Sequence, residues 1–248
     1  MFVRLAALAA VALGTISAAD PKAAEIADNM MKAMGGLDAW NKAHFVRYDF
    51  TVNIGGKTVV DRSHLWDKMT GRYRLEGKDK EGRETVALFN IGNQQGTAYV
   101  AGKKLEGVAA AAALKDAYGA FINDMYWLAM PWKWTDQGVN LKLVGAKTLN
   151  GKKYDVVQLT FGKVGLTPGD AYEAYVSPAT HLMEHWEYKL QSGQTGAWDW
   201  HYATTGGVKL ASDHTTPDGK RISMGDVRVM DTTDEAYFTD PAKRLRGK

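Results

Sequence analysis

GVAAAAALKDAYGAFINDMYWLAMPWKW, which spans residues 107–134, is the stretch that decides the fold. It reads as one long helix with almost no polar face, and a helix that is apolar on nearly every side needs a covering of protein or lipid. Four polar residues interrupt the run: Lys115, Asp116, Asn123 and Asp124. Interruptions this frequent argue against a membrane span of about 20 apolar residues. We therefore expect a chain that does not span a membrane, with a sheet that curls around this helix.

The sequence on both sides of this stretch alternates with the period of a β-strand. In HFVRYDFTVNI, residues 44–54, apolar and polar side chains alternate from Val46 to Ile54, which is typical of a strand with one buried face. Similar segments follow, joined by short turns, so neighbours in sequence should pair in space. The predicted fold class is α+β, with a single antiparallel, strongly curved sheet. We expect an incomplete β-barrel of about 11 strands, wrapped around the central apolar helix.

A short N-terminal helix is expected in residues 20–34. Asp20 and Pro21 are typical of a helix N-cap and first helical position, and Gly35 and Gly36 are typical of a helix end. The expected buried stripe of this helix consists of Ile26, Met30, Met34 and Leu37.

The first 19 residues have the three parts of a secretory signal peptide. Arg4 supplies the positive charge, residues 5–16 are apolar, and small residues precede a cleavage site before Asp20. Residues 20–248 contain no linker-like segment, so we expect them to form a single domain. Because the sequence has no cysteine, the lipid-attachable residue of a lipoprotein is missing. We expect the mature protein in the periplasm or secreted.

Charge and motifs exclude several function classes. The net charge is +3 and the basic residues are spread evenly, so no nucleic-acid partner is indicated. The sequence has no Walker, dinucleotide-binding or EF-hand motif, and we expect no cofactor. Ser212, Asp213 and His214 are adjacent but lack a nucleophile elbow, and His214 is interpreted as a hydrogen-bonded core histidine.

Eight tryptophans and eleven tyrosines make a heavy aromatic content. If residues 192–196 close a hairpin, Lys189 lies opposite Asp199, and the next turn places Trp200 beside Leu210. One face of these strands is then aromatic and should face inward. Its members are Trp186, Tyr188, Trp198, Trp200 and Tyr202.

The second half of the helical stretch also carries flat or flexible apolar side chains, which suit either core packing or an adaptable pocket mouth. The candidate ligand-binding residues combine this stretch with the aromatic face: Phe121, Met125, Trp127, Leu128, Trp132, Trp134, Trp186, Tyr188, Trp198, Trp200 and Tyr202.

His181-Leu182-Met183-Glu184-His185 matches the H-x-x-E-H pattern of inverted zinc peptidases. This chemistry needs a helix, because on a strand the two histidines would lie about 13 Å apart at 3.3 Å per residue. The surrounding sequence favours a strand, so we assign no metal and no catalytic residue. A zinc-dependent hydrolase, drawing also on Glu187 and His201, remains an alternative.

The order of elements resembles the LolA and LolB type of half-barrel, the fold of periplasmic lipoprotein carriers. Three strings, at residues 126–133 (YWLAMPWK), 167–172 (TPGDAY) and 237–241 (YFTDP), are similar to a family of exported bacterial proteins of uncharacterised activity assigned to that fold. The resemblance implies a hydrophobic cavity between sheet and helix, and transfers no functional residue. We therefore expect a protein that binds or carries a lipid or a lipoprotein acyl chain. An envelope protein–protein interaction module is the other alternative.

Overall fold

The computed structural model describes residues 20–162 and 167–247, so the expected signal peptide lies outside the described residues. The helices are α1 (Pro21–Ala33), α2 (Leu37–Lys42), α3 (Gly107–Ala129), the 3-10 helix η1 (Met130–Lys133) and α4 (Ala236–Thr239). The strands are β1 (Phe45–Ile54), β2 (Lys57–Asp67), β3 (Arg72–Lys78), β4 (Glu84–Asn90), β5 (Gly96–Val100), β6 (Lys103–Lys104), β7 (Val139–Leu149), β8 (Lys152–Phe161), β9 (Ala171–Val176), β10 (Met183–Lys189), β11 (Thr195–Thr205), β12 (Val208–Thr215) and β13 (Arg221–Met230).

All strands belong to one antiparallel sheet, in the order β6-β5-β4-β3-β2-β1-β13-β12-β11-β10-β9-β8-β7. Among the described residues β6 and β7 are the two ends of the sheet, so the barrel is incomplete. The predicted fold class is confirmed, with 13 strands instead of about 11. Pairing of β1 with β13 joins the first strands of the chain to the last.

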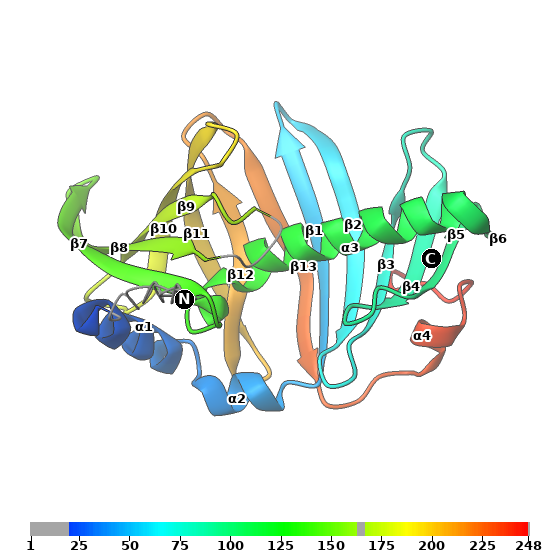
Figure 1. Ribbon diagram of the computed structural model, residues 1–248, viewed down its shortest axis with the longest axis horizontal. Helices are drawn as coiled ribbons and strands as arrows, with labels where there is room; N and C mark the ends of the chain where they lie inside the picture. Colours follow the sequence, from blue (N-terminus) through cyan, green and yellow to red (C-terminus); the bar gives the residue numbers. More distant parts are fainter. Residues whose placement is uncertain (1–19, 163–166, 248) are drawn as a thin grey trace, which may run out of the picture.

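Helix α3 crosses one face of this sheet, from β4 and β5 at its start to β12 at its end (Figure 1). The sheet-facing positions include Ala117, Phe121, Met125 and Leu128, whose spacing of three or four residues places them on one side of a helix. The α-helical hydrogen bonding ends at Ala129, because Pro131 has no N–H to continue it.

The sheet does not cover the first turns of α3. Val108 is 88% exposed, and Ala109, Ala111 and Ala112 are also exposed. These turns lie beside the short strands β5 and β6 at the end of the sheet (Figure 1), where few side chains are available to cover them. Alanine methyl groups lose little by remaining in water, since burial contributes only about 25 cal/mol per Å² of apolar surface.

Helix α1 begins as predicted and packs against the sheet. The Asp20 side chain accepts hydrogen bonds from the Lys22 and Ala23 N–H groups. Met30 and Met34 are buried, whereas Leu37 is 41% exposed because it starts the separate helix α2. At Gly35 a Cβ atom would lie 2.3 Å from the Gly207 carbonyl oxygen, so only glycine permits this close approach to the β11–β12 turn.

The register of the last hairpins differs from the prediction. Lys189 was expected opposite Asp199, but it pairs with Thr195, and Asp199 pairs with His185. The pairing of β10 with β11 is therefore shifted by an even number of residues. An even shift preserves which side chains share a face, so the aromatic face survives the error. Trp200 pairs with His214, and a bulge near Tyr202 changes the register beyond it.

The C-terminal tail lies against the outer face of β1–β3, the face opposite α3. Leu245 packs there with Phe45 and Leu65. The fully buried Arg74 donates hydrogen bonds to the Tyr237 and Asp240 carbonyls, each at 2.9 Å. It also bonds the carbonyl of Lys243 and pairs with the Glu76 carboxylate. One buried guanidinium therefore ties the tail to the sheet.

Candidate ligand-binding site

Trp127, on the last turns of α3, is the centre of an aromatic cluster on the inner face of the sheet. Its ring centroid lies 4.9 Å from that of Trp186, 5.2 Å from Trp198 and 6.3 Å from Trp200. The imidazole of His214 is 5.1 Å away and lies 4.3 Å from Trp200. Strands β10, β11 and β12 thus present adjacent aromatic rings to one helix side chain.

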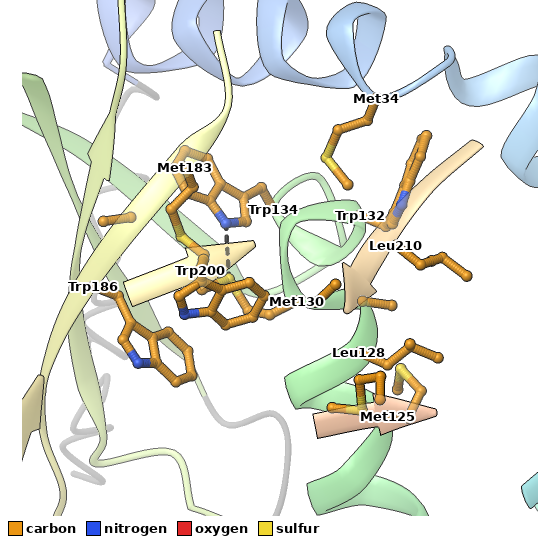
Figure 2. Close-up of a cluster of buried hydrophobic side chains, with 14 of the residues drawn as sticks. Met34, Met125, Leu128, Met130, Trp132, Trp134, Met183, Trp186, Trp200 and Leu210 are labelled. Carbon is orange, nitrogen blue, oxygen red and sulfur yellow. Dashed lines mark hydrogen bonds between the residues drawn. The ribbon is translucent and has the colours of Figure 1, made fainter. Parts of the chain in front are cut away.

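The other predicted site residues lie around this cluster, in different packing environments. Phe121 precedes Trp127 on α3 and packs against Trp66 of β2 and Tyr73 of β3. Trp132 stacks on Trp40 at 5.2 Å, and its indole N–H donates to the Lys209 carbonyl. The Trp134 indole N–H donates to the Met130 sulfur at 3.0 Å (Figure 2). The ring of Tyr188 lies beside that of Tyr172, and the Tyr202 hydroxyl donates to the Met183 carbonyl at 2.7 Å.

Most of the predicted ligand-binding residues belong to the hydrophobic core. Trp186 and Trp200 are each 2% exposed, and Met125 and Leu128 are buried beside them. Figure 2 shows these side chains interdigitated between helix and sheet. Along its second half, α3 therefore fills the concavity of the sheet with direct side-chain packing.

A half-buried apolar stripe borders this core along α3. It consists of Leu114, Tyr118, Ile122 and Tyr126, each four residues from the next and each packed on the edge of the main core. Its last member, Tyr126, lies 5.7 Å from Tyr172 and 6.1 Å from Trp186. The stripe therefore leads from the exposed half of the helix to the aromatic cluster.

A buried polar network between α3 and β1–β3 was not predicted from the sequence. The Asp124 carboxylate pairs with Arg62 at 2.8 Å and with the His64 Nε2 atom at 3.1 Å. His64 Nδ1 lies 2.8 Å from the Tyr73 hydroxyl, which is 3.0 Å from the Tyr48 hydroxyl. The signal was available, since Asp124 falls on the buried side of an apolar helix. Arg62 and His64 likewise take inward positions of an alternating strand.

Burial sets the protonation of this network. It lowers the pKa of His64, against the opposing effect of the Asp124 carboxylate, and raises the pKa of the Tyr73 hydroxyl. His64, Tyr73 and Asp124 are all inaccessible to solvent. This arrangement fastens α3 to the sheet.

Two hollows lie on the outer face of the sheet. One of about 750 Å³ is lined by side chains of both charges, including Lys147, Glu173, Glu187 and Lys189. The other, of about 260 Å³, lies against the C-terminal tail. Both are open to solvent and have charged side chains in their lining, so neither is the cavity predicted between sheet and helix.

The H-x-x-E-H segment is not helical, so the zinc-hydrolase alternative is not supported. His181 precedes β10 with a φ of 57°, and Glu184 is held by Lys152 and Thr180. His185 Nδ1 lies 2.7 Å from Asp199. Within residues 20–162 and 167–247, no three His, Cys, Asp or Glu side chains gather as metal ligands.

In the part of the chain that the structure describes, no helix combines the length and apolar character needed to cross a membrane. A family model, described as a family of unknown function (DUF6503), matches residues 99–215, somewhat less than half of the 248-residue chain. Comparison with curated proteins gives no match.

Several solved structures are similar to this chain. A DUF1329 family protein from Desulfovibrio piger has a TM-score of 0.49 and 13% identity, covering 89% of this chain and 98% of that one. A LolA superfamily protein from Nitrosomonas europaea has a TM-score of 0.49 and 10% identity, with coverages of 87% and 96%. A domain described as an outer membrane lipoprotein-sorting protein, from Vibrio parahaemolyticus, has a TM-score of 0.47, 10% identity and coverages of 88% and 96%. These similarities concern the fold alone. The half-barrel layout predicted from the sequence is confirmed by the single open antiparallel sheet itself.

Proposed function

We propose that this protein binds or carries a hydrophobic ligand, a lipid or a lipoprotein acyl chain, between α3 and the inner face of the sheet. The observation that carries this proposal is the half-buried stripe Leu114, Tyr118, Ile122 and Tyr126. A row of apolar side chains left partly in water beside an aromatic core is typical of a ligand-binding or interaction surface.

The stripe has the dimensions of an acyl-chain site. From Leu114 to Tyr126 it extends about 18 Å at 1.5 Å per helical residue. Each methylene group that a ligand buries there would contribute about 0.8 kcal/mol, so a long chain needs no charged anchor for micromolar affinity. The predicted residues Trp127 and Trp186 would form the closed end of this site.

Export belongs to the same proposal. We propose that residues 20–248 form one half-barrel domain, released in the periplasm or outside the cell by cleavage before Asp20. In support, α1 starts directly at Pro21, and Asp20 serves as its N-cap. Sequencing the N-terminus of the exported protein checks this, and a start other than Asp20 would contradict the predicted cleavage site.

Binding can be measured with the uncharged fluorescent probe 1-N-phenylnaphthylamine and by native mass spectrometry of protein purified from an exporting host. We expect probe binding that acyl compounds displace, and co-purified lipid. Ile122→Asp places a carboxylate in the stripe and should weaken probe binding at least about tenfold, because a buried charge without a partner is costly. Lys115→Asp, at an exposed position of the same helix, is the matched control and should bind like the wild type.

Protein that is empty as purified and does not bind the probe would refute the carrier function. If Ile122→Asp and Lys115→Asp weakened probe binding equally, the ligand would not bind at the stripe.

Docking of an envelope protein is a second candidate, which the exposed start of α3 favours. Val108 is 88% exposed and Ala109, Ala111 and Ala112 lie beside it, which is unusual for a helix without a partner. A photo-crosslinker at Val108 should give a defined product in cells. The same crosslinker at the exposed Lys57 is the control, and identical products at both positions would remove this candidate.

A further inference from the structure

Three polar side chains in the aromatic cluster have no hydrogen-bond partner among the described residues. They are the indole Nε1 atoms of Trp186 and Trp200 and the imidazole nitrogens of His214. Trp186 and Trp200 are 2% exposed and His214 is fully buried. A buried polar group without a partner is costly, so three such groups in one place call for an explanation beyond core packing.

These groups belong to one small region. The rings of Trp186 and Trp200 lie 5.0 Å apart, and the ring of His214 lies 4.3 Å from Trp200. Figure 2 shows the two indoles side by side, next to the Trp134 indole, which does have a partner in Met130. The indole N–H groups of Trp132 and Trp134 have partners, whereas that of Trp66, outside this cluster, has none within the described part of the chain.

The region is uncharged. Burial, with a smaller contribution from His201, lowers the pKa of His214 from 6.5 to about 3. The Trp127 carbonyl opposes this shift, although it does not meet hydrogen-bond geometry with either imidazole nitrogen. His214 is therefore a neutral imidazole at physiological pH. The surrounding side chains are indoles, which carry no charge and can only donate hydrogen bonds.

We infer that Trp186, Trp200 and His214 form a binding site for the uncharged oxygen of an acyl ester or amide. This inference rests on the proposed function and names the class of its ligand. The acyl chain lies along the α3 stripe, and its carbonyl oxygen accepts hydrogen bonds from the two indoles. His214, as a neutral imidazole, can donate to the same oxygen or accept from an adjacent amide.

The chemistry of the site selects against two related ligand classes. A hydrocarbon leaves the three polar groups unsatisfied, so it gains nothing at this end of the site. A fatty-acid carboxylate would lose its hydration without a cation to pair with, which is far more costly than burying a neutral carbonyl.

Trp127 is the side chain that a ligand must displace. It is half-buried, packs on Trp186 and Trp200, and belongs to the last turns of α3. A rotation of Trp127 toward solvent would join the stripe, through Tyr126, to the two unpaired indoles.

Three compounds of equal chain length test the inference: dodecane, methyl dodecanoate and dodecanoate. Their affinities are measured by displacement of 1-N-phenylnaphthylamine near neutral pH. We expect methyl dodecanoate to bind about tenfold more tightly than dodecane, and dodecanoate to bind more weakly than the ester. Indole N–H resonances of Trp186 and Trp200 should shift with the ester and stay in place with dodecane.

Trp200→Phe removes one donor while keeping an aromatic ring, and should abolish most of the ester preference. Trp66→Phe is the matched control, because its indole nitrogen is also buried and unpartnered but lies near Trp40 and Phe121. The control should keep the preference.

Equal binding of ester and dodecane, or an ester preference that survives in Trp200→Phe, would overturn the inference while leaving the carrier function intact. Failure of all three compounds to displace the probe, or of the probe to bind, would count against the proposed function itself. The resonance measurement uses the wild-type chain, so it decides the question even where a variant does not fold.

Discussion

Asp124 is a charged residue that the helix α3 buries completely. Its carboxylate pairs with Arg62, contacts His64 and accepts a hydrogen bond from the Asn123 side chain at 2.8 Å. Tyr73 extends the network behind His64. A polar network of this kind stabilises one position of the helix on the sheet, because any slip along the helix axis would leave buried groups without partners.

Asp124→Ala is expected to lower the free energy of unfolding by about 3 kcal/mol, because His64 and the Arg62 guanidinium would lose their buried partner. Urea denaturation measures this loss. The control Asp116→Ala changes an exposed carboxylate of the same helix and should change the free energy by less than about 0.5 kcal/mol. Equal effects of the two substitutions would show that the network contributes little.

At the scale of the element, the C-terminal tail owes its position to the side chains beneath it. Arg74 holds several tail carbonyls, while Arg72 pairs with Glu235 at 2.5 Å and Arg246 pairs with Asp61. Among the described residues of the tail, Leu245 is buried in this region, and Tyr237 and Phe238 pack there partly buried. Polar contacts to β2 and β3 therefore decide whether the tail stays docked.

Arg74→Gln should release the tail, because an amide cannot replace the fork of guanidinium donors. Trypsin should then cut after Lys243 and Arg244 in the folded protein, faster than in the wild type. Mass spectrometry of short digests follows the cleavage. The control Arg83→Gln removes an exposed arginine of the β3–β4 turn and should leave the cleavage rate unchanged. Unchanged cleavage in Arg74→Gln would mean that other contacts hold the tail.

At the scale of the whole molecule, buried histidines couple stability to pH. Burial lowers the pKa of His64 and lowers that of His214 from 6.5 to about 3. The unfolded chain protonates both near pH 6.5, while the folded chain resists protonation. Their neutral forms therefore stabilise the fold fully above pH 6.5, and this stabilisation is lost as the pH falls toward the folded pKa.

We expect the free energy of unfolding to decrease between about pH 6.5 and about pH 4.5 by up to about 1.4 kcal/mol per pH unit for each histidine. Urea denaturation across this range measures the slope. His214→Phe should remove its share of the slope, whereas His181→Asn, at an exposed position, should not. A slope that is unchanged in His214→Phe would contradict the buried neutral imidazole.

The elements were more predictable than their contacts. The limits of α1 and of β1 follow from Asp20, Pro21 and a strict period of two, because capping and side-chain parity are local properties. The aromatic face survived a wrong hairpin register, since an even shift keeps parity. The partner of Trp200 was missed, because the bulge at Tyr202 is not encoded in the alternation.

The sequence by itself determined the antiparallel pairing of strands that are neighbours in sequence, the long apolar helix and the set of aromatic side chains that face it. These depend on patterns within a few residues. Only the tertiary structure decided that the first half of α3 is exposed, that Asp124 meets His64 and Arg62, and that Trp186, Trp200 and His214 are buried without partners. Burial and hydrogen-bond partners depend on contacts between segments that are far apart in the chain, and local sequence patterns do not specify those contacts.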